Sequence, residues 1–406
     1  MLKGKTIILG VSGGIAVYKS VELLRLLTKA GADVHVVMTE SAREFVTPLT
    51  FQTLSGNPVH TELFNLYQER EIGHISLADR ADLFVLAPAT ANLIGKIAQG
   101  LADDLLTTTL MATKAPVLVV PAMNTNMYEN PFYQRNERIL RDSGYHLLDP
   151  VHGDLACGWA GQGKMPDPQE IVTAVGDVLA VKDLHGCNIL VSAGPTREEI
   201  DPVRYLTNHS SGRMGYAIAD AARRRGAKVT LVSGPCQLSP PAGVETIPVV
   251  SAQQMYDAMS GCFDTSDVVI KAAAVADYRP LKRRGQKLKK KTATISLELE
   301  KTVDILAALG RRKDKQILVG FAAETEKLVE HATEKLISKN LDMIVANDVS
   351  APGAGFDVDT NIVRFLHRDG AAEQLELMSK AAVAEQLLDR IHSIRQQGKK
   401  TEIKQP

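Results

Sequence analysis

Glycine, hydroxyl and amide residues follow several apolar runs in the first half of the chain, where they could bind an anionic ligand. Ser12, Gly13 and Gly14 come directly after the run TIILGV. Such a turn lets backbone N–H groups approach an anion at the start of a helix. The GxGxxG spacing and the later acidic residue of an NAD site are both absent. The turn therefore suits a mononucleotide phosphate, or is simply a tight turn between a strand and a helix.

Three further segments of the first half favour a ligand site. APATAN (87–92) and PAMNTNM (121–127) each end an apolar run. Open α/β sheets bind ligands at the carboxyl ends of their strands, which is where these segments would lie. Residues 154–165 hold three glycines around Cys157 and the chain's single tryptophan, a composition typical of a mobile flap over a site.

Polar groups are also concentrated in the second half. The segment 192–215 is rich in hydroxyl, amide and arginine groups, which suits an anionic substrate. Asp277 follows another apolar run, where its carboxylate could meet a hydrated Mg²⁺. The basic stretch Lys282–Lys291 could be a solvated loop or a nucleic-acid patch, but it lacks the interleaved aromatic residues that stack on bases. We favour a flexible lysine loop that closes over a polyphosphate. The absence of GxxxxGK[ST] excludes a P-loop.

The elements that must position these residues follow a repeated pattern. A strand, a glycine turn, a helix and a second strand are expected over residues 5–39, and again over 188–234. Apolar runs alternate with helical patterns throughout, which predicts α/β architecture. We expect two doubly wound, mostly parallel, Rossmann-like domains, the first flavodoxin-like, over residues 1–181 and 182–406. A helix at 167–179 would close the first domain, and a helix at 379–395 would precede a disordered tail at 396–406.

Composition limits the class of protein. Lys and Arg number 47, as do Asp and Glu, so the net charge of zero argues against a general nucleic-acid or membrane-surface protein. The four cysteines form no CxxC pair, and no apolar run approaches the roughly 20 residues that span a bilayer. With no signal-peptide pattern at the start, we expect a soluble cytoplasmic protein.

The motifs of the first half, in their order, resemble those of the flavin-dependent cysteine decarboxylases, and most closely the phosphopantothenoylcysteine decarboxylases. They are SGGIAVYK, EIGHISLA with His74, APATAN, PAMNTNM and ACGWAGQGKM. Thr90, Tyr128 and Lys164 stand where serine, tryptophan and arginine are common, which affects fine specificity more than reaction type.

This resemblance implies an FMN cofactor. FMN would take a hydride from the cysteinyl side chain of the substrate, so that the carboxylate can leave as CO2. Cys157 would supply a proton, His74 would hold substrate and assist proton movement, Asn124 would meet the carboxylate, and Met127 would contact substrate. A lone histidine or cysteine is usually a packing residue, so these roles depend on the motif context. The residues implied to bind FMN are Ser12, Gly13, Gly14, Thr39, Pro88, Ala89, Thr90 and Asn92.

Motifs across residues 188–388 resemble the bacterial phosphopantothenate–cysteine ligases, so the whole chain resembles the bifunctional decarboxylase–ligases of coenzyme A synthesis. They are AGPTREEIDPVRYLTNHSSGRMG, KAAAVADYRP, QKLKKK, GFAAET and NLDMIVANDV. The resemblance implies that the substrate carboxylate attacks the α-phosphate of CTP, and that the amine of cysteine then attacks the acyl-cytidylate.

Site residues follow from the same resemblance. Lys287 would close on the CTP phosphates, Asn208 would hold the acyl intermediate, Arg204 would support phosphopantothenate, and Asp277 would bind Mg²⁺. Val303–Leu306 read VDIL where relatives often have PDIV. The residues implied to line the CTP pocket are Lys271, Ala272, Ala273, Asp277, Val303, Asp304, Ile305, Leu306, Phe321, Lys335 and Lys339.

Two other functions remain open at this stage. The first half alone could act as a flavoprotein on another thiol or a prenyl acceptor, but Cys157 argues against prenyl transfer. The chain could also be a flavin-binding regulatory subunit that inhibits a phosphatase, but Asn208, Asp277 and Lys287 occur together, as a ligase needs. The resemblance further implies small-molecule substrates as partners, and a homo-oligomer, a dodecamer of decarboxylase trimers and ligase dimers.

Overall fold

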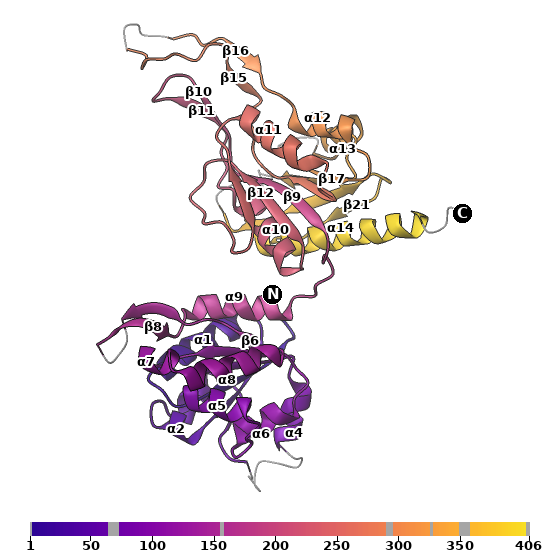
Figure 1. The fold of residues 1–406 in the computed structure, drawn as a ribbon. Helices are drawn as coiled ribbons and strands as arrows, with labels where there is room; N and C mark the ends of the chain where they lie inside the picture. The colour runs from indigo at the N-terminus through magenta and orange to yellow at the C-terminus, as the bar shows by residue number, and fades with distance from the viewer. Residues whose placement is uncertain are drawn as a thin grey trace. The chain divides into compact units, whose positions relative to one another are not determined.

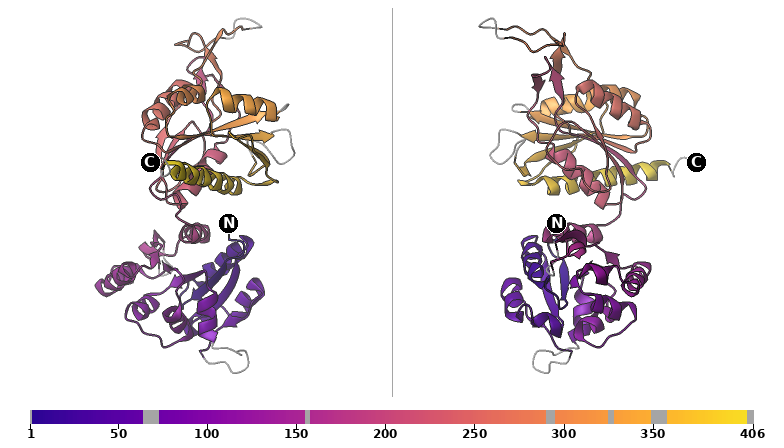
Figure 2. Two further views of the ribbon diagram at one scale, coloured as in Figure 1. Left: turned by 90° about the vertical axis from the view of Figure 1, so that its right-hand side faces the viewer. Right: turned by 60° about the vertical axis from the view of Figure 1, so that its left-hand side comes forward.

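The computed structural model of the chain describes residues 2–63, 73–154, 158–289, 295–324, 328–348 and 358–402. The chain divides into two compact units, Met1–Ala180 and Val181–Pro406, each with its own sheet and core (Figure 1). In both units helices cover the two faces of the sheet (Figure 2). Two doubly wound α/β units agree with the expected fold class.

The first unit is built around a parallel sheet. Its elements are β1 Thr6–Val11, α1 Val17–Lys29, β2 Asp33–Met38, α2 Glu40–Arg43, α3 Pro48–Ser55, β3 Val59–His60, α4 Gly73–Arg80, β4 Leu83–Ala89, α5 Ala91–Ala98, α6 Leu105–Ala112, β5 Val117–Pro121, α7 Thr125–Tyr128, α8 Pro131–Asp142, β6 His146–Leu147, β7 Val151–Asp154, β8 Ala160–Lys164 and α9 Pro168–Leu179.

The strand order of this sheet is β3-β2-β1-β4-β5-β6, with every pair parallel. Without the two-residue edge strand β3, the order becomes the 2-1-3-4-5 of flavodoxin-like folds, as predicted. The order reverses between β1 and β4, which opens a crevice at their carboxyl ends. β7 and β8 form a separate antiparallel hairpin.

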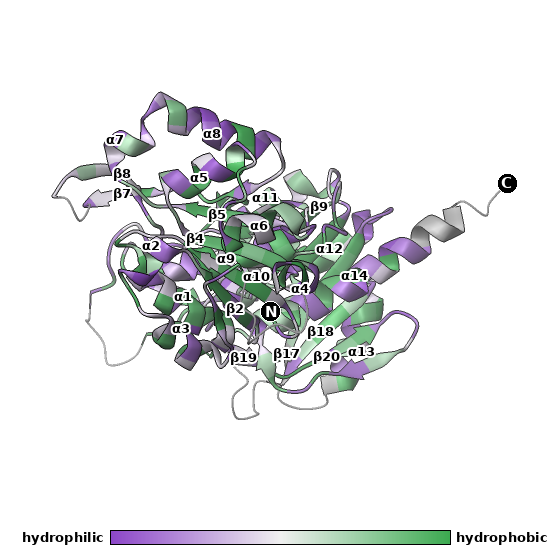
Figure 3. Ribbon diagram, turned by 90° about the horizontal axis from the view of Figure 1, so that it is seen from below, coloured by the Kyte–Doolittle hydropathy of each residue, from purple (hydrophilic) through white to green (hydrophobic). Residues whose placement is uncertain are grey.

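Burial on both faces explains the long apolar runs. Every residue of β4 and β5 is buried. Side chains of one face of the sheet pack with α1, α3 and α9, and those of the other face pack with α4, α5, α6 and α8. The hydropathy colouring shows the same pattern, with hydrophobic strands and hydrophilic residues along α8 and α14 (Figure 3).

The second unit repeats this plan with more strands. Its elements are β9 Asn188–Ala193, β10 Arg197–Glu199, β11 Tyr205–Thr207, α10 Arg213–Arg224, β12 Lys228–Ser233, β13 Glu245–Pro248, α11 Ala252–Phe263, β14 Val268–Lys271, β15 Tyr278–Pro280, β16 Leu299–Lys301, α12 Ile305–Arg312, β17 Ile317–Glu324, α13 Leu328–Ser338, β18 Met343–Asp348, β19 Thr360–Asn361, β20 Val363–His367, β21 Ala372–Gln374, β22 Met378–Ser379 and α14 Lys380–Glu402.

The main sheet of this unit has the order β13-β12-β9-β14-β17-β18-β20-β21. The strands from β13 to β18 are parallel, and β20 and β21 extend the edge in antiparallel fashion. α10 and α14 cover one face, and α11, α12 and α13 cover the other. The reversal of strand order lies between β9 and β14. Two small hairpins, β10–β11 and β15–β16, project from this sheet's loops and contact each other.

The prediction of a disordered tail is wrong for residues 396–402, because α14 continues to Glu402. Residues 403–406 lie outside the described part. α14 packs on α10, and a helix that is already formed extends more easily than a new one nucleates. The added residues are mostly good helix formers (Gln, Lys and Glu), which offset the low helix propensity of Gly398. Within the described residues, no helix is long and apolar enough to cross a membrane.

Candidate active sites

A cavity of about 760 Å³ lies at the β1–β4 switch point of the first unit. Loops that follow β1, β2, β4 and β5 form its walls, as expected for ligand sites of open parallel sheets. The hairpin β7–β8 contributes a further wall. The structure brings together here these residues predicted from the sequence: Ser12, Gly13, Gly14, Thr39, Thr90, Asn92, Asn124 and Met127.

Ser12 joins the two strands at the switch point. Its buried Oγ donates to the carbonyl of Pro88 at 2.7 Å and accepts from the backbone N–H of Thr90 at 3.0 Å. Pro88 and Ala89 are themselves buried in β4 and do not line the cavity. These two hydrogen bonds fix the end of β1 against the end of β4, so Ser12 helps to shape the cavity wall.

The turn after β1 requires glycine at position 13. A Cβ on Gly13 would lie 2.4 Å from the Cβ of Ser41, so no larger residue fits without displacing α2. Thr39 follows β2 at the same edge, and its buried Oγ1 has no hydrogen-bond partner in the described part of the chain. A buried hydroxyl of this kind at a cavity wall is suited to a polar ligand.

Two glycines attach the β7–β8 hairpin to the segment that carries Asn124. A Cβ on Gly161 would lie 2.3 Å from Thr125 Oγ1, and a Cβ on Gly163 would lie 2.3 Å from the Met123 carbonyl oxygen. The N–H of Met123 donates to the carbonyl of Gly163 at 2.9 Å. Asn124 itself caps α7, since its Oδ1 accepts from the N–H of Asn126 at 2.9 Å. The hairpin and the cap together fix the place of Asn124 at the cavity.

The structure does not bring His74 to this cavity. His74 lies on α4, which packs against α6. Its ring is half-buried, and its Nδ1 has no hydrogen-bond partner among the residues that the structure describes. It is not among the lining residues of this chain. Cys157 lies outside the described residues.

A second cavity, of about 610 Å³, lies at the β9–β14 switch point of the second unit. The structure brings together here these residues predicted from the sequence: Asn208, Lys271, Ala272, Ala273, Asp277, Val303, Asp304, Ile305, Leu306, Phe321, Lys335 and Lys339.

Close packing at the start of α10 shapes one side of this cavity. Gly212 has φ +77° and precedes the helix, and a Cβ on Gly215 would lie 2.5 Å from the Cβ of Ala193 in β9. Ser192 Oγ accepts from the N–H of Ala273 at 3.2 Å, which ties β9 to β14 at the reversal. The backbone N–H groups of the first turn of α10 are thus presented to the cavity, where an anion is stabilised.

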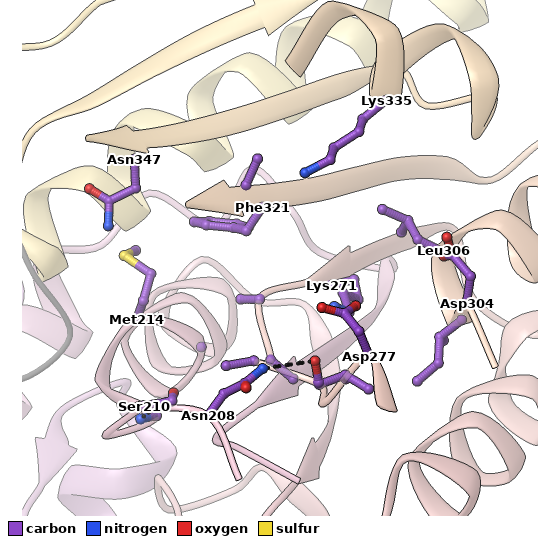
Figure 4. Close-up of a pocket in the computed structure, with 18 of the residues that line it drawn as sticks. Asn208, Ser210, Met214, Lys271, Asp277, Asp304, Leu306, Phe321, Lys335 and Asn347 are labelled. Atoms are coloured by element: carbon purple, nitrogen blue, oxygen red, sulfur yellow. Dashed lines mark hydrogen bonds between the residues drawn. The ribbon is translucent and has the colours of Figure 1, made fainter. Parts of the chain in front are cut away.

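Charged side chains line the opposite side (Figure 4). Burial, and next the positive charge of Lys339, lower the pKa of Lys271 to about 8. Asp304 caps α12 through Ala307 and pairs with Lys339 at 2.8 Å. Burial opposes ionisation of Asp304, but the hydrogen bond from Lys339 lowers its pKa overall. Asp277 faces Lys271, whereas the other carboxylate of this side, Asp304, is the one that pairs with Lys339.

Asn208 is oriented by a backbone contact. Its Nδ2 donates to the carbonyl of Val275 at 3.0 Å, shown as a dashed line in Figure 4. Val275 lies in the loop that leads from β14 to Asp277. The contact therefore holds the Asn208 amide beside the loop that carries the predicted metal-binding carboxylate.

Arg204 and Lys287 do not line the cavity. Arg204 Nη2 donates to the carbonyl of Leu288 at 3.0 Å, and the N–H of Leu288 donates to Asp201 at 3.1 Å. The N–H of Arg284 also donates to the carbonyl of Ile200 at 3.0 Å. These bonds hold the described part of the basic segment against the β10–β11 arm, with Lys287 exposed.

Comparison with known proteins decides the family. The family model described as "Flavoprotein" matches residues 1–180, and the model of the DNA/pantothenate metabolism flavoprotein C-terminal domain matches residues 184–394. The coenzyme A biosynthesis bifunctional protein CoaBC of Bacillus subtilis (strain 168) is 50% identical over 401 residues, which cover 98% of this chain and 99% of that protein. This chain belongs to the CoaBC family.

The chain is also similar to other CoaBC proteins. The CoaBC of Escherichia coli (strain K12) is 47% identical over 395 residues, which cover 96% of this chain and 97% of that protein. The crystal structure of the C-terminal domain of a CoaBC is 49% identical, with a TM-score of 0.47, and covers 53% of this chain and 99% of that one. CoaBC proteins combine a phosphopantothenoylcysteine decarboxylase with a phosphopantothenate–cysteine ligase, both part of coenzyme A biosynthesis.

Sequence reasoning gave no individual role to several residues of the two CoaBC cavities. Lys19 and Lys164 line the first cavity. Both lie within motifs of the family resemblance, SGGIAVYK and ACGWAGQGKM, but neither was given a role. Asn347 lines the second cavity, and its buried Oδ1 has no hydrogen-bond partner among the described residues. Other missed residues of the second cavity are Ser210, Ser211, Gly212, Arg213, Met214, Gly215, Tyr278, Lys301, Thr302, Asn361 and Lys380. Segment 192–215, rich in hydroxyl, amide and arginine groups, was the signal that pointed to the residues from Ser210 to Gly215.

Proposed function

We propose that the second unit condenses 4′-phosphopantothenate with cysteine at the expense of CTP, and that the first unit decarboxylates the product to 4′-phosphopantetheine with FMN. One observation carries this proposal: each unit holds a cavity at its own switch point, lined by most of the binding residues that the two resemblances single out. The family assignment gives the pair of activities. The cofactor, the nucleotide and the residue roles are our inference.

The second cavity suits a nucleotide triphosphate and a carboxylic acid. The first turn of α10 and the cations Lys271, Lys335 and Lys339 offer positive charge for phosphate oxygens. Asp277 would hold Mg²⁺, which usually binds one or two carboxylates together with substrate phosphates. Among the described residues, no group of three acidic, histidine or cysteine side chains forms a site for metal by itself, which agrees with a metal held in part by substrate.

Ligation would proceed in two steps. The carboxylate of phosphopantothenate attacks the α-phosphorus of CTP, the bond to the β-phosphate breaks, and pyrophosphate leaves with its electron pair. The amine of cysteine then attacks the acyl carbon and releases CMP. Asn208 would position the acyl group through the amide that Val275 orients, and Lys287 would neutralise phosphate charge after its segment leaves the β10–β11 arm.

The first cavity fits FMN. The glycine turn offers backbone N–H groups for a phosphate, and the unpartnered Thr39 hydroxyl offers a polar contact for the same ligand. Bound FMN would supply the reversible two-electron oxidation of the substrate's cysteinyl carbon. Asn124 would bind the substrate carboxylate without adding a repelling charge. Cys157 would deliver a proton to the product, and His74 would reach the site of a neighbouring subunit.

Assembly and location complete the proposal. The cavity of the first unit is bordered by exposed Ile15 and Tyr18, 59% and 61% accessible, as expected if another subunit covers it. We expect a dodecamer in which the first units form trimers and the second units form dimers. Its substrates, CTP and free cysteine, favour action in the cytoplasm.

Product analysis tests the whole proposal. Purified protein is incubated with phosphopantothenate, cysteine, MgCl2 and CTP, and the products are identified by mass spectrometry. We expect 4′-phosphopantetheine together with CMP and pyrophosphate. Accumulation of phosphopantothenoylcysteine would leave the ligase intact and refute the decarboxylase. No product from folded, flavin-loaded protein would favour a flavin-binding regulatory subunit instead.

A further inference from the structure

Two lysines of the first cavity have no ion-pair partner within the described part of the chain. The lysines of the described cavity wall are Lys19, Lys96 and Lys164. Lys96 pairs with Asp103 at 2.7 Å and with Asp104 at 3.3 Å. Among the described residues, neither Lys19 nor Lys164 has a carboxylate at ion-pair distance.

Lys19 reaches from α1 to the base of the hairpin. Its Nζ donates to the carbonyl of Met165 at 2.7 Å, the residue that directly follows Lys164. Burial, and next the charge of Lys164, lower the pKa of Lys19. The two ammonium groups therefore repel each other in the absence of a ligand, and an anion between them would relieve that repulsion.

The hairpin holds Lys164 at the same place. Gly163, with φ +140°, seats β8 on the Met123 carbonyl. The stem of Lys164 then crosses β7, because a Cβ on Gly153 would lie 3.3 Å from its Cδ and 3.5 Å from its Nζ. Glycine at 153 leaves room for the side chain. Both lysines are half-buried, so each keeps donors for a ligand inside the cavity.

The proposed substrate carries two anionic groups at opposite ends. Its carboxylate must be lost as CO2, and the neutral amide of Asn124 suits that group. Its phosphate monoester carries nearly two negative charges near neutrality, which two ammonium groups match. The glycine turn after β1 already accounts for the phosphate of a flavin. The carboxylates of the described cavity wall are Glu40, Asp103, Asp104 and Asp154. Because Asp103 and Asp104 pair with Lys96, the unpaired positive charge of the described wall lies at Lys19 and Lys164.

We propose that Lys19 and Lys164 form the subsite that binds the phosphate monoester of the decarboxylase substrate. This rests on the proposed decarboxylation and adds a substrate specificity to it. The subsite makes the first unit discriminate between phosphopantothenoylcysteine and its dephosphorylated counterpart. The alternative is that the two lysines bind the phosphate of the flavin, and the experiment below distinguishes the two cases.

The test uses the full-length, flavin-loaded protein and its Lys164→Gln, Lys164→Arg and Lys29→Gln variants. Lys29 is an exposed residue at the end of α1, outside the cavity. Lys29→Gln removes one positive charge, as Lys164→Gln does, and therefore serves as the control. CO2 release is measured with phosphopantothenoylcysteine and with pantothenoylcysteine. The affinity for FMN is measured by quenching of flavin fluorescence as apoprotein is titrated.

We expect Lys164→Gln to raise KM for the phosphorylated substrate about tenfold or more, the size of one charge-assisted hydrogen bond, and to leave pantothenoylcysteine and FMN affinity unchanged. Lys164→Arg should keep the wild-type preference, and Lys29→Gln should match wild type throughout. An equal loss with both substrates would overturn the subsite. Weaker FMN binding would instead assign the lysines to the flavin phosphate.

Failure of the proposed function gives a different result. If wild-type protein released no CO2 from either compound, decarboxylation would be refuted. Binding isotherms of the two compounds with the same variants would then decide the subsite by themselves. A phosphate-dependent affinity that Lys164→Gln removes supports it, and equal affinities of wild type and variant for both compounds refute it.

Discussion

Replacing Gly163 by alanine tests how the hairpin positions the decarboxylase cavity. Gly163 has φ +140°, a region that L residues rarely adopt, and a Cβ at this position would lie 2.3 Å from the carbonyl oxygen of Met123. That separation is about 0.7 Å below the 3.0 Å limit that real Cβ contacts respect. Either β8 or the segment before Asn124 must therefore move.

The size of the effect follows from this geometry. Backbone strain of this kind costs about 1–3 kcal/mol. Relief of the overlap shifts the Met123 carbonyl or the hairpin by several tenths of an ångström, directly beside Asn124. A displacement near 1 Å in a catalytic site can lower the rate about 100-fold. We therefore expect kcat/KM for decarboxylation to fall by about one to two orders of magnitude, with ligation unchanged because the ligase cavity lies in the other unit.

The assay pairs CO2 release with pyrophosphate release on the same preparation, and thermal unfolding reports stability. The matched control is Gly144→Ala, whose φ is +86° and whose Cβ would meet nothing within 4 Å. This control carries conformational strain without the overlap. If Gly163→Ala decarboxylated as well as Gly144→Ala, the hairpin contact would have no part in positioning Asn124.

Three further perturbations separate the proposed roles. Cys157→Ser should bind FMN and release CO2 but accumulate an oxidised enethiol product, and a normal yield of phosphopantetheine by mass spectrometry would contradict the proton-donor role. Lys287→Gln should slow pyrophosphate release at least about 100-fold and leave decarboxylation unchanged. The matched change at another exposed lysine, Lys315→Gln, should leave both activities unchanged. Equal loss of both activities in Lys287→Gln would argue against independent sites. Lys271, with a pKa of about 8, should lose its charge above that pH, so KM for CTP should rise between pH 7 and 9, and Lys271→Met should show a high KM without that rise. Since an unfolded lysine keeps its proton up to about pH 10.5, Lys271 by itself should also make stability increase between pH 8 and 10.5, which the Met variant would lack in denaturant titrations.

Much of the fold was predictable from local patterns. β4 coincides with the apolar run LFVLAPA, because a strand buried on both faces has no polar alternation. Helix α9 begins after Asp167, whose side chain accepts from the N–H of Gln169, as the Asp-Pro start indicates. The end of α14 was not predictable in this way, because its continuation depends on a helix already nucleated by packing on α10.

The candidate sites were predictable in part. Residues directly after strands, such as Thr90 and Ala272, reach the cavities because parallel strands end at one edge of the sheet. Lys287 was predicted for the nucleotide pocket but lies outside it, held by bonds between Leu288 and the β10–β11 arm. Those partners lie more than 80 positions away in the sequence, and no local pattern records such a contact.

The sequence by itself determined the residue types, the order of the strands and helices, and the two glycine turns, since these depend on neighbours within a few positions. Tertiary structure alone decided which groups satisfy each other. Ser12, predicted to bind the cofactor, lines the cavity and also bridges β1 and β4. Lys19 and Lys164 lie 145 positions apart in the sequence and line the same cavity. The reason is physical: the strength of a charge or hydrogen bond depends on distance and burial, which only the folded chain sets.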